Sequence, residues 1–267
     1  MKRRLDENCT LLVNSCDSYS DCWDGFFKLL KIQWPTFNMD ILLNTETKTY
    51  SFEDLRITTF SMYQSKKVAW GRRMIETLKK IKTKYVLFAL EDFYLESPVD
   101  EDRLVKCYEY MENNPNIAYF SFFPTVDSHN VKSEKYEGFE LRSQNGEYRL
   151  NCQFALWNRE KLISYIRPHE SPWEWELYGS KRSSRYKEEF YTISEEPPRI
   201  FDYQNGGAIM RGRWCLARVK PLCEKYNFTV DFSARDTYED FVKLAPKHKR
   251  KLLRGIKNRI NKIRSII

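Results

Sequence analysis

The spacing of hydrophobic residues alternates between two periods along the first third of the chain. Short apolar runs bounded by polar segments predict buried strands, whereas apolar residues three and four positions apart predict amphipathic helices. These patterns give a strand, a helix, two strands, a helix and a strand, at 10–14, 23–30, 40–43, 55–59, 66–84 and 85–90. Asp21 or Ser20 is the expected N-cap of the first helix. This order is typical of the nucleotide-binding type of α/β half.

The rest of the chain continues the α/β pattern before it becomes irregular. We expect a helix begun by Pro98 and Asp100, an aromatic strand, a polar excursion or hairpin, a strand and a helix, at 98–111, 117–123, 128–146, 150–157 and 159–166. The stretch 167–212 is rich in Pro, Trp and Tyr and has little periodicity, and such long irregular stretches are often functional. We expect one large α/β domain over residues 1–235 and a basic amphipathic helix over 236–267.

The strand at 85–90 ends in two adjacent carboxylates, Glu91 and Asp92. The strand is apolar at successive positions, as expected for a parallel strand that helices cover on both faces. Open α/β sheets bind ligands at the carboxyl ends of their strands. The sequence therefore predicts an acidic ligand site at this point. The alternative is a solvated strand end at which Asp92 caps a turn.

Cysteine and hydropathy patterns exclude several classes of protein. The seven cysteines are odd in number and form no C-x-x-C pair, so they predict neither a disulfide framework nor a zinc site, and reduced cytosolic thiols are expected. No charged and then apolar leader opens the chain, and no run of about 18 apolar residues occurs. We therefore expect a cytoplasmic protein that does not cross a membrane.

The formal charge of +8 is concentrated at the C-terminal end. Ten of the 45 Lys and Arg residues lie between Phe241 and Ile267, where no acidic residue occurs, so the preceding chain holds 35 basic and 37 acidic residues. Leu and Ile recur at three- and four-residue spacing among these basic residues, which is the pattern of a basic amphipathic helix. We expect this helix to lie on an anionic membrane surface, where each basic residue contributes on the order of 1 kcal/mol. The alternative is a helix packed on the domain with its charges in water.

Four segments together resemble bacterial glycosyltransferases of the GT-A type, of the kind that builds capsular and other surface polysaccharides. They read N-S-C-D-S-Y-S-D-C-W, W-G-R-R, Y-V-L-F-A-L-E-D-F-Y and S-P-W-E-W-E-L-Y-G-S, beginning at Asn14, Trp70, Tyr85 and Ser171. The resemblance covers most of residues 1–213 and implies a single GT-A-like domain with a Rossmann-type mixed sheet flanked by helices. The sequence departs from the usual D-x-D motif, because Phe93 follows Glu91 and Asp92 and leaves no acid at the third position.

The resemblance also implies a pocket for a nucleotide-sugar donor at the strand ends. The residues that would surround the base and ribose follow the first two strands: Asn14, Ser15, Asp17, Asn44 and Glu46. Arg73 would approach the diphosphate, because a guanidinium binds phosphate oxygens bidentately. Asp92, with Glu91, would hold Mg²⁺ or Mn²⁺, which suit hard oxygen ligands and would neutralise the departing nucleoside diphosphate.

The W-E-W-E segment at 173–176 would supply the acceptor side of the reaction. Inverting transfer needs a carboxylate base within reach of the acceptor hydroxyl. Glu174 and Glu176 are the candidates, and the resemblance favours Glu176, the second acid. In an extended segment these two acids share one face and Trp173 and Trp175 share the other, whereas at a helix start the acids point apart. Because a sugar packs its C–H groups on an indole, both tryptophans are expected acceptor contacts, with core aromatics as the alternative.

Taken together, the resemblance implies a hexosyltransferase at the inner face of the cell membrane that moves a sugar from a nucleotide-sugar donor to a lipid-linked or growing oligosaccharide acceptor. Two other classes remain open. A nucleic-acid-binding protein would use the basic tail and the abundant aromatic residues, but the tail's regular apolar stripe is not what a phosphate-tracking groove needs, so no nucleic-acid partner is expected. A GT-A-like protein that has lost catalysis and binds glycan would explain the missing third-position acid.

Overall fold

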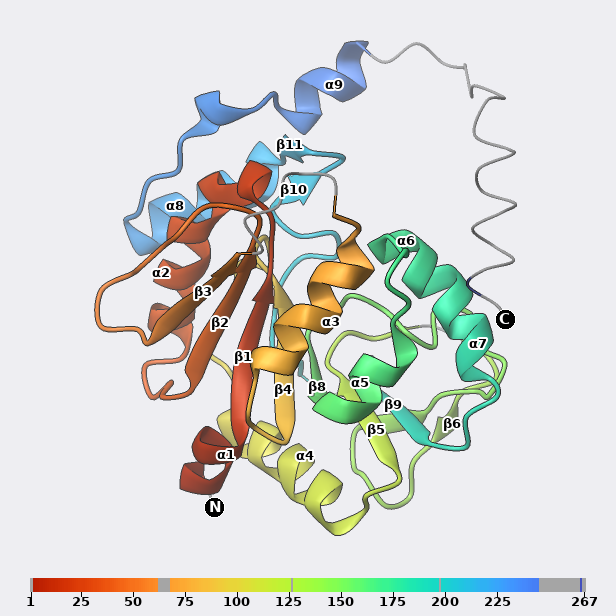
Figure 1. The fold of residues 1–267 in the computed structure, drawn as a ribbon. Helices are drawn as coiled ribbons and strands as arrows, with labels where there is room; N and C mark the ends of the chain where they lie inside the picture. The colour runs from red at the N-terminus through yellow and green to blue at the C-terminus, as the bar shows by residue number, and fades with distance from the viewer. Residues whose placement is uncertain (1, 62–67, 126, 197, 245–264, 266–267) are drawn as a thin grey trace.

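The described residues form a nine-stranded mixed sheet with helices on both faces, which confirms the expected α/β architecture (Figure 1). The structure is a computed structural model that describes residues 2–61, 68–125, 127–196, 198–244 and 265. Its first elements are α1 (Lys2–Asn8), β1 (Cys9–Asn14), the 3₁₀ helix η1 (Asp17–Cys22), α2 (Trp23–Gln33), β2 (Asp40–Thr45), β3 (Ile57–Ser61), α3 (Trp70–Lys80), β4 (Tyr85–Leu90), α4 (Glu101–Asn113) and β5 (Ile117–Ser121). The elements that follow are β6 (Val131–Lys132), β7 (Phe139–Leu141), β8 (Ala155–Asn158), α5 (Arg159–Tyr165), α6 (Pro172–Glu174), the π-helix η2 (Trp175–Gly179), α7 (Ser180–Ser183), β9 (Glu189–Ile193), β10 (Ile209–Met210), β11 (Arg213–Trp214), α8 (Leu216–Tyr226), the 3₁₀ helix η3 (Phe232–Ala234) and α9 (Tyr238–Leu244).

The first four strands are parallel and lie in the order β3-β2-β1-β4. The chain therefore leaves β1 toward one side of the sheet and returns to its other side at β4. In doubly wound sheets this reversal of direction opens a crevice outside the carboxyl ends of the two strands, and ligands bind there. The crevice expected between β1 and β4 lies at the end of the sheet near β10 and β11 (Figure 1).

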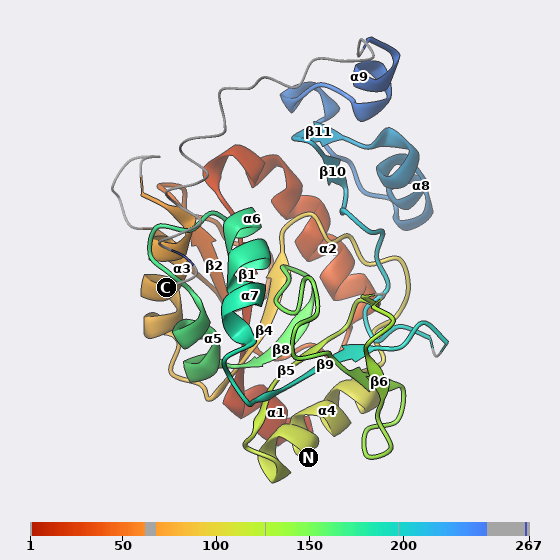
Figure 2. The same cartoon turned by 90° about the vertical axis from the view of Figure 1, so that its right-hand side faces the viewer.

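Alternation along the central strands divides the core into two halves. Leu11 and Val13 of β1 contact one hydrophobic cluster, which includes residues of α2, α4 and α8, whereas Leu12 contacts the other, which includes residues of α3 and α5. Leu87 and Val86 of β4 divide in the same way. Figure 2 shows these two helical layers on opposite faces of the sheet. A strand buried on both faces needs no polar positions, and this explains the continuous apolar run at 85–90.

The second half of the sheet departs from the expected pattern. β8 pairs antiparallel with both β4 and β5, and β9 pairs parallel with β5 and antiparallel with β7. The stretch 167–212 was expected to be irregular, but it contains α6, η2, α7 and β9. β9 is one of the buried strands of the sheet, and its five residues are too few to show a period in the sequence. The expected hairpin within 128–146 is confirmed as β6 and β7.

Two expected boundaries are wrong. Neither Asp21 nor Ser20 caps α2, because both already lie inside η1 and the N-cap is Cys22, which makes no side-chain capping hydrogen bond. The strand expected at 150–157 begins only at Ala155. By contrast, Asp100 caps α4 as expected and accepts a hydrogen bond from Arg103 N.

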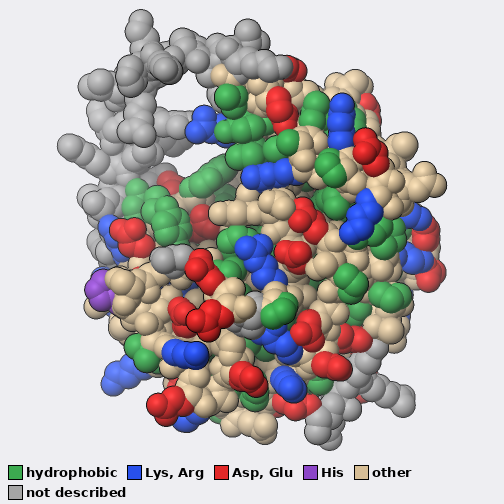
Figure 3. All heavy atoms as spheres, turned by 180° about the vertical axis from the view of Figure 1, so that it is seen from behind, with side chains coloured by type: hydrophobic (Ala, Val, Ile, Leu, Met, Phe, Trp, Pro, Cys, Tyr) green, Lys and Arg blue, Asp and Glu red, His purple; other side chains and the backbone are tan. Residues whose placement is uncertain are grey.

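Surface charge and the C-terminal segment bear on possible partners. Seen from behind, basic and acidic side chains are interspersed over the face that Figure 3 shows, in keeping with the nearly balanced charge of residues before Phe241. Most of the expected amphipathic helix over 236–267, and of the membrane-facing segment from Phe241 to Ile267, lies outside the described residues. Of the helices that the structure describes, none combines the length and hydropathy of a transmembrane span. All seven cysteines are free.

Candidate functional site

The carboxyl ends of β1 and β2 bring their polar residues together. Asn44 Nδ2 donates to Asn14 Oδ1 at 2.9 Å, and Ser15 N donates to the Asn44 carbonyl oxygen at 3.1 Å. All three residues are buried, and Trp23 Nε1 fixes the Ser15 hydroxyl with a 2.8 Å hydrogen bond. Asn44 Oδ1 has no hydrogen-bond partner among the described residues. This part of the predicted donor pocket is therefore assembled by neighbouring strands, with one buried acceptor atom unused.

Asp17 and Glu46 hold the loops after β1 and β2 together. Asp17 N donates to Glu46 Oε2 at 3.1 Å, and Glu46 N donates to Asp17 Oδ1 at 3.0 Å. Burial alone would raise the pKa of Asp17, but hydrogen bonds from Thr47, Glu46 and Lys48 together lower it to about 2. The Asp17 carboxylate is therefore ionised and used internally. It fixes the two loops that follow β1 and β2 relative to each other.

Arg73 projects from the first turn of α3 toward the same strand ends. Its NH1 donates to the Ser15 carbonyl oxygen at 3.3 Å and lies 4.0 Å from Glu46 Oε1. The residue is only 8% exposed, and its Nε has no hydrogen-bond partner within the described ranges. A buried guanidinium with an unused N–H is costly unless another group accepts from it. Arg73 therefore offers a binding atom for an anionic ligand.

Glu91 and Asp92 form a buried acidic pair at the end of β4. Burial raises the pKa of Glu91 well above its usual value, and the neighbouring Asp92 raises it further, although a hydrogen bond from the Ser15 hydroxyl acts in the opposite direction. Burial also raises the pKa of Asp92, to about 7, against the lowering effect of a hydrogen bond from the Ile209 backbone. Two carboxylates in so little water repel each other, so the pair favours a proton or a cation.

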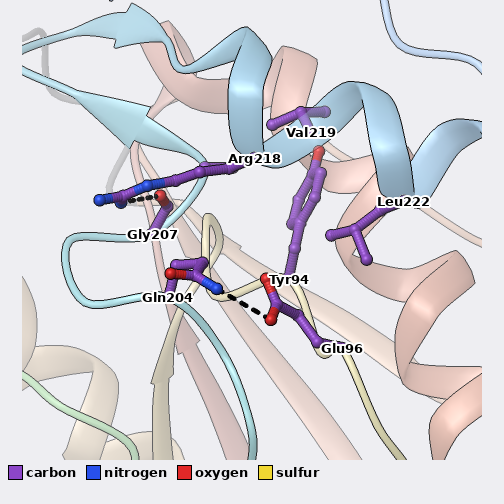
Figure 4. Close-up of a pocket in the computed structure, with 8 residues that line it drawn as sticks. Tyr94, Glu96, Gln204, Gly207, Arg218, Val219 and Leu222 are labelled. Atoms are coloured by element: carbon purple, nitrogen blue, oxygen red, sulfur yellow. Dashed lines mark hydrogen bonds between the residues drawn. The ribbon is translucent and has the colours of Figure 1, made fainter.

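A glycine turn closes one side of the pair. Gly206 and Gly207 have φ values of +83° and +67°, and Ala208 N donates to the Asp92 carbonyl oxygen at 2.8 Å. Arg218 reaches from α8 and donates to the Gly207 carbonyl oxygen at 2.8 Å (Figure 4). Left-handed backbone of this kind favours glycine, and the missing side chain of Gly207 lets the turn lie directly against Asp92. In the sequence, Asn205, Gly206 and Gly207 indicate a tight turn, with a backbone that could approach substrate as the alternative.

Arg235 lies above the acidic pair and comes from the C-terminal side of the domain. Its Nε donates to Asp21 Oδ2 at 2.7 Å, and its guanidinium carbon lies 4.6 Å from the centre of the Tyr19 ring. The charge of Arg235 lowers the pKa of both acids of the pair. Burial and the two acids raise the pKa of Tyr19 to about 12, so the ring is neutral and close to the acidic site. Sequence reasoning missed Tyr19 and Arg235, which lie far apart in the chain.

The W-E-W-E segment is helical, so its two acids and its two tryptophans point apart. Glu174 belongs to a capping box in which Ser171 N donates to Glu174 Oε2 at 2.8 Å. Trp175 is 2% exposed and packs between Trp70 and Trp157, whereas Trp173 is 73% exposed. Only Trp173 therefore presents an indole face to solvent, and Trp175 is a core residue.

Glu176 is the second residue of the π-helix η2 (Trp175–Gly179), a rare form of helix that often marks functional sites. Its Oε1 accepts a 2.8 Å hydrogen bond from Cys152 N. Burial raises the pKa of Glu176, and the hydrogen bonds from the Cys152 backbone and thiol lower it in part. Cys152 lies just before β8, whose Ala155 pairs with Phe88 of β4. Because the two strands are antiparallel, the segment before β8 and the segment after β4 lie at the same end of the sheet. Glu176 and the acidic pair therefore border the same end of the fold.

The acidic pair fits a divalent cation that a ligand helps to bind. Among the residues described, no group of three or more His, Cys, Asp and Glu side chains is arranged to hold a metal ion. Mg²⁺, however, is commonly bound through one or two carboxylates together with waters and substrate phosphates. Glu91 and Asp92 supply two such carboxylates, and a cation would relieve their mutual repulsion.

Comparisons with known proteins give structural likenesses only. No protein-family model matches the chain, and no curated protein matches it. Similar solved structures include S. aureus TarS 1–349, with 10% identity and a TM-score of 0.46 over 70% of this chain and 60% of that one. Another is the mannosyltransferase PcManGT from Pyrobaculum calidifontis in complex with GDP-Man and Mn²⁺, with 11% identity and a TM-score of 0.45 over 77% of this chain and 58% of that one. A third is the bifunctional IspDF from Campylobacter jejuni, with 9% identity and a TM-score of 0.41 over 71% and 50%. The chain thus spans 60% or less of the length of these three proteins.

Proposed function

We propose that the protein is a glycosyltransferase that uses a nucleotide-sugar donor, binds the donor at the β1–β4 crevice and transfers the sugar with inversion to a glycan acceptor. The observation that carries this proposal is the buried pair Glu91 and Asp92 at the point where the sheet reverses direction, beside Ser15 and Arg73. This is the place where doubly wound sheets bind nucleotides.

The donor residues divide by their chemistry. Asn14, Asn44 and the loops fixed by Asp17 and Glu46 would surround the base and ribose, with the unused Asn44 Oδ1 as an acceptor atom. Arg73 would donate its Nε–H, which has no partner among the described residues, to the diphosphate, because guanidinium groups pair with phosphate oxygens.

Glu91 and Asp92 would hold Mg²⁺ or Mn²⁺ together with the diphosphate. When bound, the cation neutralises negative charge on the departing nucleoside diphosphate. The protein itself keeps both carboxylates buried and backs Asp92 with the Gly207 turn, so that their positions are fixed before the donor arrives.

Glu176 would act as the base on the acceptor side. The acceptor hydroxyl gives its proton to the Glu176 carboxylate, its oxygen forms a bond to the anomeric carbon, and the bond to the nucleoside diphosphate breaks with the electron pair leaving on that group. Burial raises the pKa of Glu176 and so makes it a stronger base than an exposed glutamate. Trp173, three residues earlier on the same helix, would contact the acceptor ring.

The expected substrates are a nucleotide-hexose donor and, as acceptor, a lipid-linked or growing surface-polysaccharide chain at the inner face of the membrane. The basic segment from Phe241 to Ile267, most of it outside the described residues, would hold the enzyme at that surface.

A thermal-stability screen with nucleoside diphosphates and nucleotide sugars, with and without Mn²⁺, tests the donor site. A ligand that binds only the native state at 100 times its Kd stabilises it by about 2.7 kcal/mol, so the midpoint must rise. We expect a Mn²⁺-dependent rise with one nucleotide, its loss in Asp92→Asn, and its retention in Asp40→Asn, which changes an exposed acid at the opposite end of β2. No rise with any nucleotide, or a rise that Asp92→Asn leaves intact, would overturn the proposal.

A further inference from the structure

We infer that a second site, one helical turn beyond Glu176, binds the sugar units that precede the reacting end of a neutral oligosaccharide acceptor. The site is a cavity of about 520 Å³ lined by the segment 145–148 and by the helix that carries Glu176, including Tyr148, Leu177 and Lys181, and we call it the Tyr148 cavity. This inference rests on the proposed transferase function and adds the acceptor's chemical class and the path of its chain.

The Tyr148 cavity is joined to Glu176 by one stretch of backbone. Cys152 N donates to Glu176 Oε1 at 2.8 Å, and Leu150 N donates to Ser180 Oγ at 2.9 Å. The segment 150–152 thus runs beside the helix, and Ser180, which lines the cavity, lies four residues after Glu176. One turn of helix rises roughly 5 Å. An oligosaccharide acceptor whose terminal sugar reacts at Glu176 would therefore have its next sugar units beside Ser180.

The lining of the cavity suits sugar rather than a charged ligand. It combines two tyrosines with serine, asparagine and leucine, and its charges are one acid, Glu147, and one base, Lys181. A phosphate-rich ligand needs an excess of cations, whereas a sugar needs aromatic faces and neutral hydrogen-bonding groups. Tyr148 and Leu177 are 44% and 47% exposed, and Trp173 lies on the helix four residues before Leu177. These exposed apolar groups therefore continue the surface from the cavity toward Glu176.

The wall that carries Tyr148 is held in place before any ligand binds. Arg142 NH2 donates to the Glu147 carbonyl oxygen at 3.0 Å, and Arg149, itself 1% exposed, donates to the Ser183 and Glu188 carbonyl oxygens. Between these two anchors Tyr148 has a φ of +52°, which a residue with a side chain rarely adopts. Backbone strain of this kind clusters at binding sites, and here the backbone from which the ring projects is already ordered before a ligand binds.

A longer oligosaccharide acceptor can extend past Tyr148 into a second cavity. A neighbouring cavity of about 750 Å³ borders the same segment 145–148 and extends to Asp127 and His129. Those two residues are hydrogen-bonded to each other, since His129 N and Nδ1 each lie 3.0 Å from Asp127 Oδ1. Each cavity is in the size range of pockets that hold a drug-sized ligand, so together they have room for several sugar rings.

Calorimetric titration with neutral oligosaccharides of one to six units, in glucose, galactose and N-acetylglucosamine series, tests the inference. We expect at least one series to bind with an affinity that rises about tenfold or more between one and four units. Tyr148→Gly, which suits the φ of +52° and removes the ring, should weaken that binding about tenfold or more, whereas Tyr148→Phe should retain it. Asn227→Gly, which makes the same replacement at an exposed residue with a φ of +49° at the C-terminal end of α8, is the control and should bind as the wild type.

No binding by any series, affinity independent of length, or equal binding by Tyr148→Gly would overturn the inference. The donor-dependent thermal shift, measured on the same variants, separates a failure of this inference from a failure of the proposed function. A retained donor shift without oligosaccharide binding removes the Tyr148 site and leaves the transferase. Length-dependent oligosaccharide binding without any donor shift supports the site and removes the transferase.

Discussion

Gly207 lies so close to Asp92 that no side chain fits between them. A Cβ atom at Gly207 would stand 2.3 Å from Asp92 Oδ2 and 2.8 Å from the Asp92 carbonyl oxygen. Real Cβ atoms essentially never approach other atoms within 3.0 Å. The backbone of the glycine turn is therefore one wall of the acidic site, and the position of Asp92 depends on it.

Gly207→Ala should displace Asp92 and weaken donor binding. The added methyl group meets the carboxylate, so either the turn or Asp92 must move. A displaced Asp92 carboxylate no longer has the position that binding of the metal and the donor requires. We expect the Mn²⁺-dependent thermal shift to be lost in this variant. Gly212→Ala is the matched control, because Gly212 also has a positive φ of +76° but no atom of the described residues lies within 4 Å of its Cβ position. It should keep the shift and lose about 1–2 kcal/mol of stability through left-handed strain alone. Equal effects in the two variants would contradict the contact with Asp92.

The raised pKa of Asp92 predicts an unusual pH dependence of stability. The folded protein keeps a proton on Asp92 up to about pH 7, whereas the unfolded chain releases it near the ordinary aspartate pKa of 3.8. The folded state therefore binds more protons between these values, and the free energy of unfolding contributed by this group falls as pH rises from about 4 to 7. At pH 8 the ionised Asp92 is a net cost in the protein without metal.

Asp92→Asn removes that cost and should raise the melting temperature at pH 8 while it abolishes donor binding. Each kcal/mol regained raises the midpoint by about 2–4 °C in a domain of this size. At pH 4, where Asp92 is protonated in the folded protein, the two midpoints should converge. Melting curves of both proteins between pH 4 and pH 8 check this, and a variant that is less stable at every pH would contradict it.

The strands β1, β2 and β4 could be predicted from the sequence because nearly all of their residues are buried. β4 is buried on both faces, so its apolar run coincides with the strand itself, and α3 before it shows a clear helical period. The polar residues that follow such strands, among them Ser15 and Asp92, are then placed at the carboxyl end of the sheet by topology alone. The strand order could not be read, but the order of elements restricted it to few possibilities.

The other parts of the site depend on contacts between residues distant in sequence. Arg235 and Asp21 form an ion pair 214 positions apart, and no local pattern marks either residue. Gly207 looks like an ordinary turn residue, because the feature that matters is the carboxylate against its backbone. Trp173 and Trp175 look equivalent in the sequence, but the helix places one in solvent and one in the core. A helical signal was available in Ser171 and Glu174, which have the spacing of a capping box.

The buried ion pair between Glu170 and Arg182 should control the stability of the helix that carries Glu176. Arg182 NH1 and NH2 donate to Glu170 Oε1 and Oε2 at 2.8 and 3.1 Å, and both side chains are almost fully buried. Glu170→Ala leaves the buried guanidinium without its carboxylate and only with backbone carbonyl partners such as Tyr165, which costs about 3–5 kcal/mol. Thermal unfolding should show this loss, while Glu196→Ala, in an exposed pair with Lys132, should leave the midpoint unchanged. A small effect of Glu170→Ala would mean that water reaches Arg182.

Substitutions at Glu176 and Glu174 should affect different properties, the first the catalytic rate and the second the stability. Glu176→Gln keeps the shape of the side chain and an oxygen that accepts from Cys152 N, but it cannot take a proton. We expect kcat with the donor found in the thermal screen to fall 10²- to 10⁴-fold, with the donor's thermal shift intact. Because burial raises the pKa of Glu176, the acid limb of the wild-type rate profile should lie above pH 4.5.

Glu174→Ala is the matched change two residues earlier. It removes one half of the capping box and should cost about 0.5–2 kcal/mol of stability with little change in kcat. Product formation by both variants, followed at a temperature well below both melting points, distinguishes the two roles. If Glu174→Ala abolished turnover while Glu176→Gln retained it, the base would be Glu174, and the acceptor would have to approach the helix from its N-terminal end, away from the Tyr148 cavity.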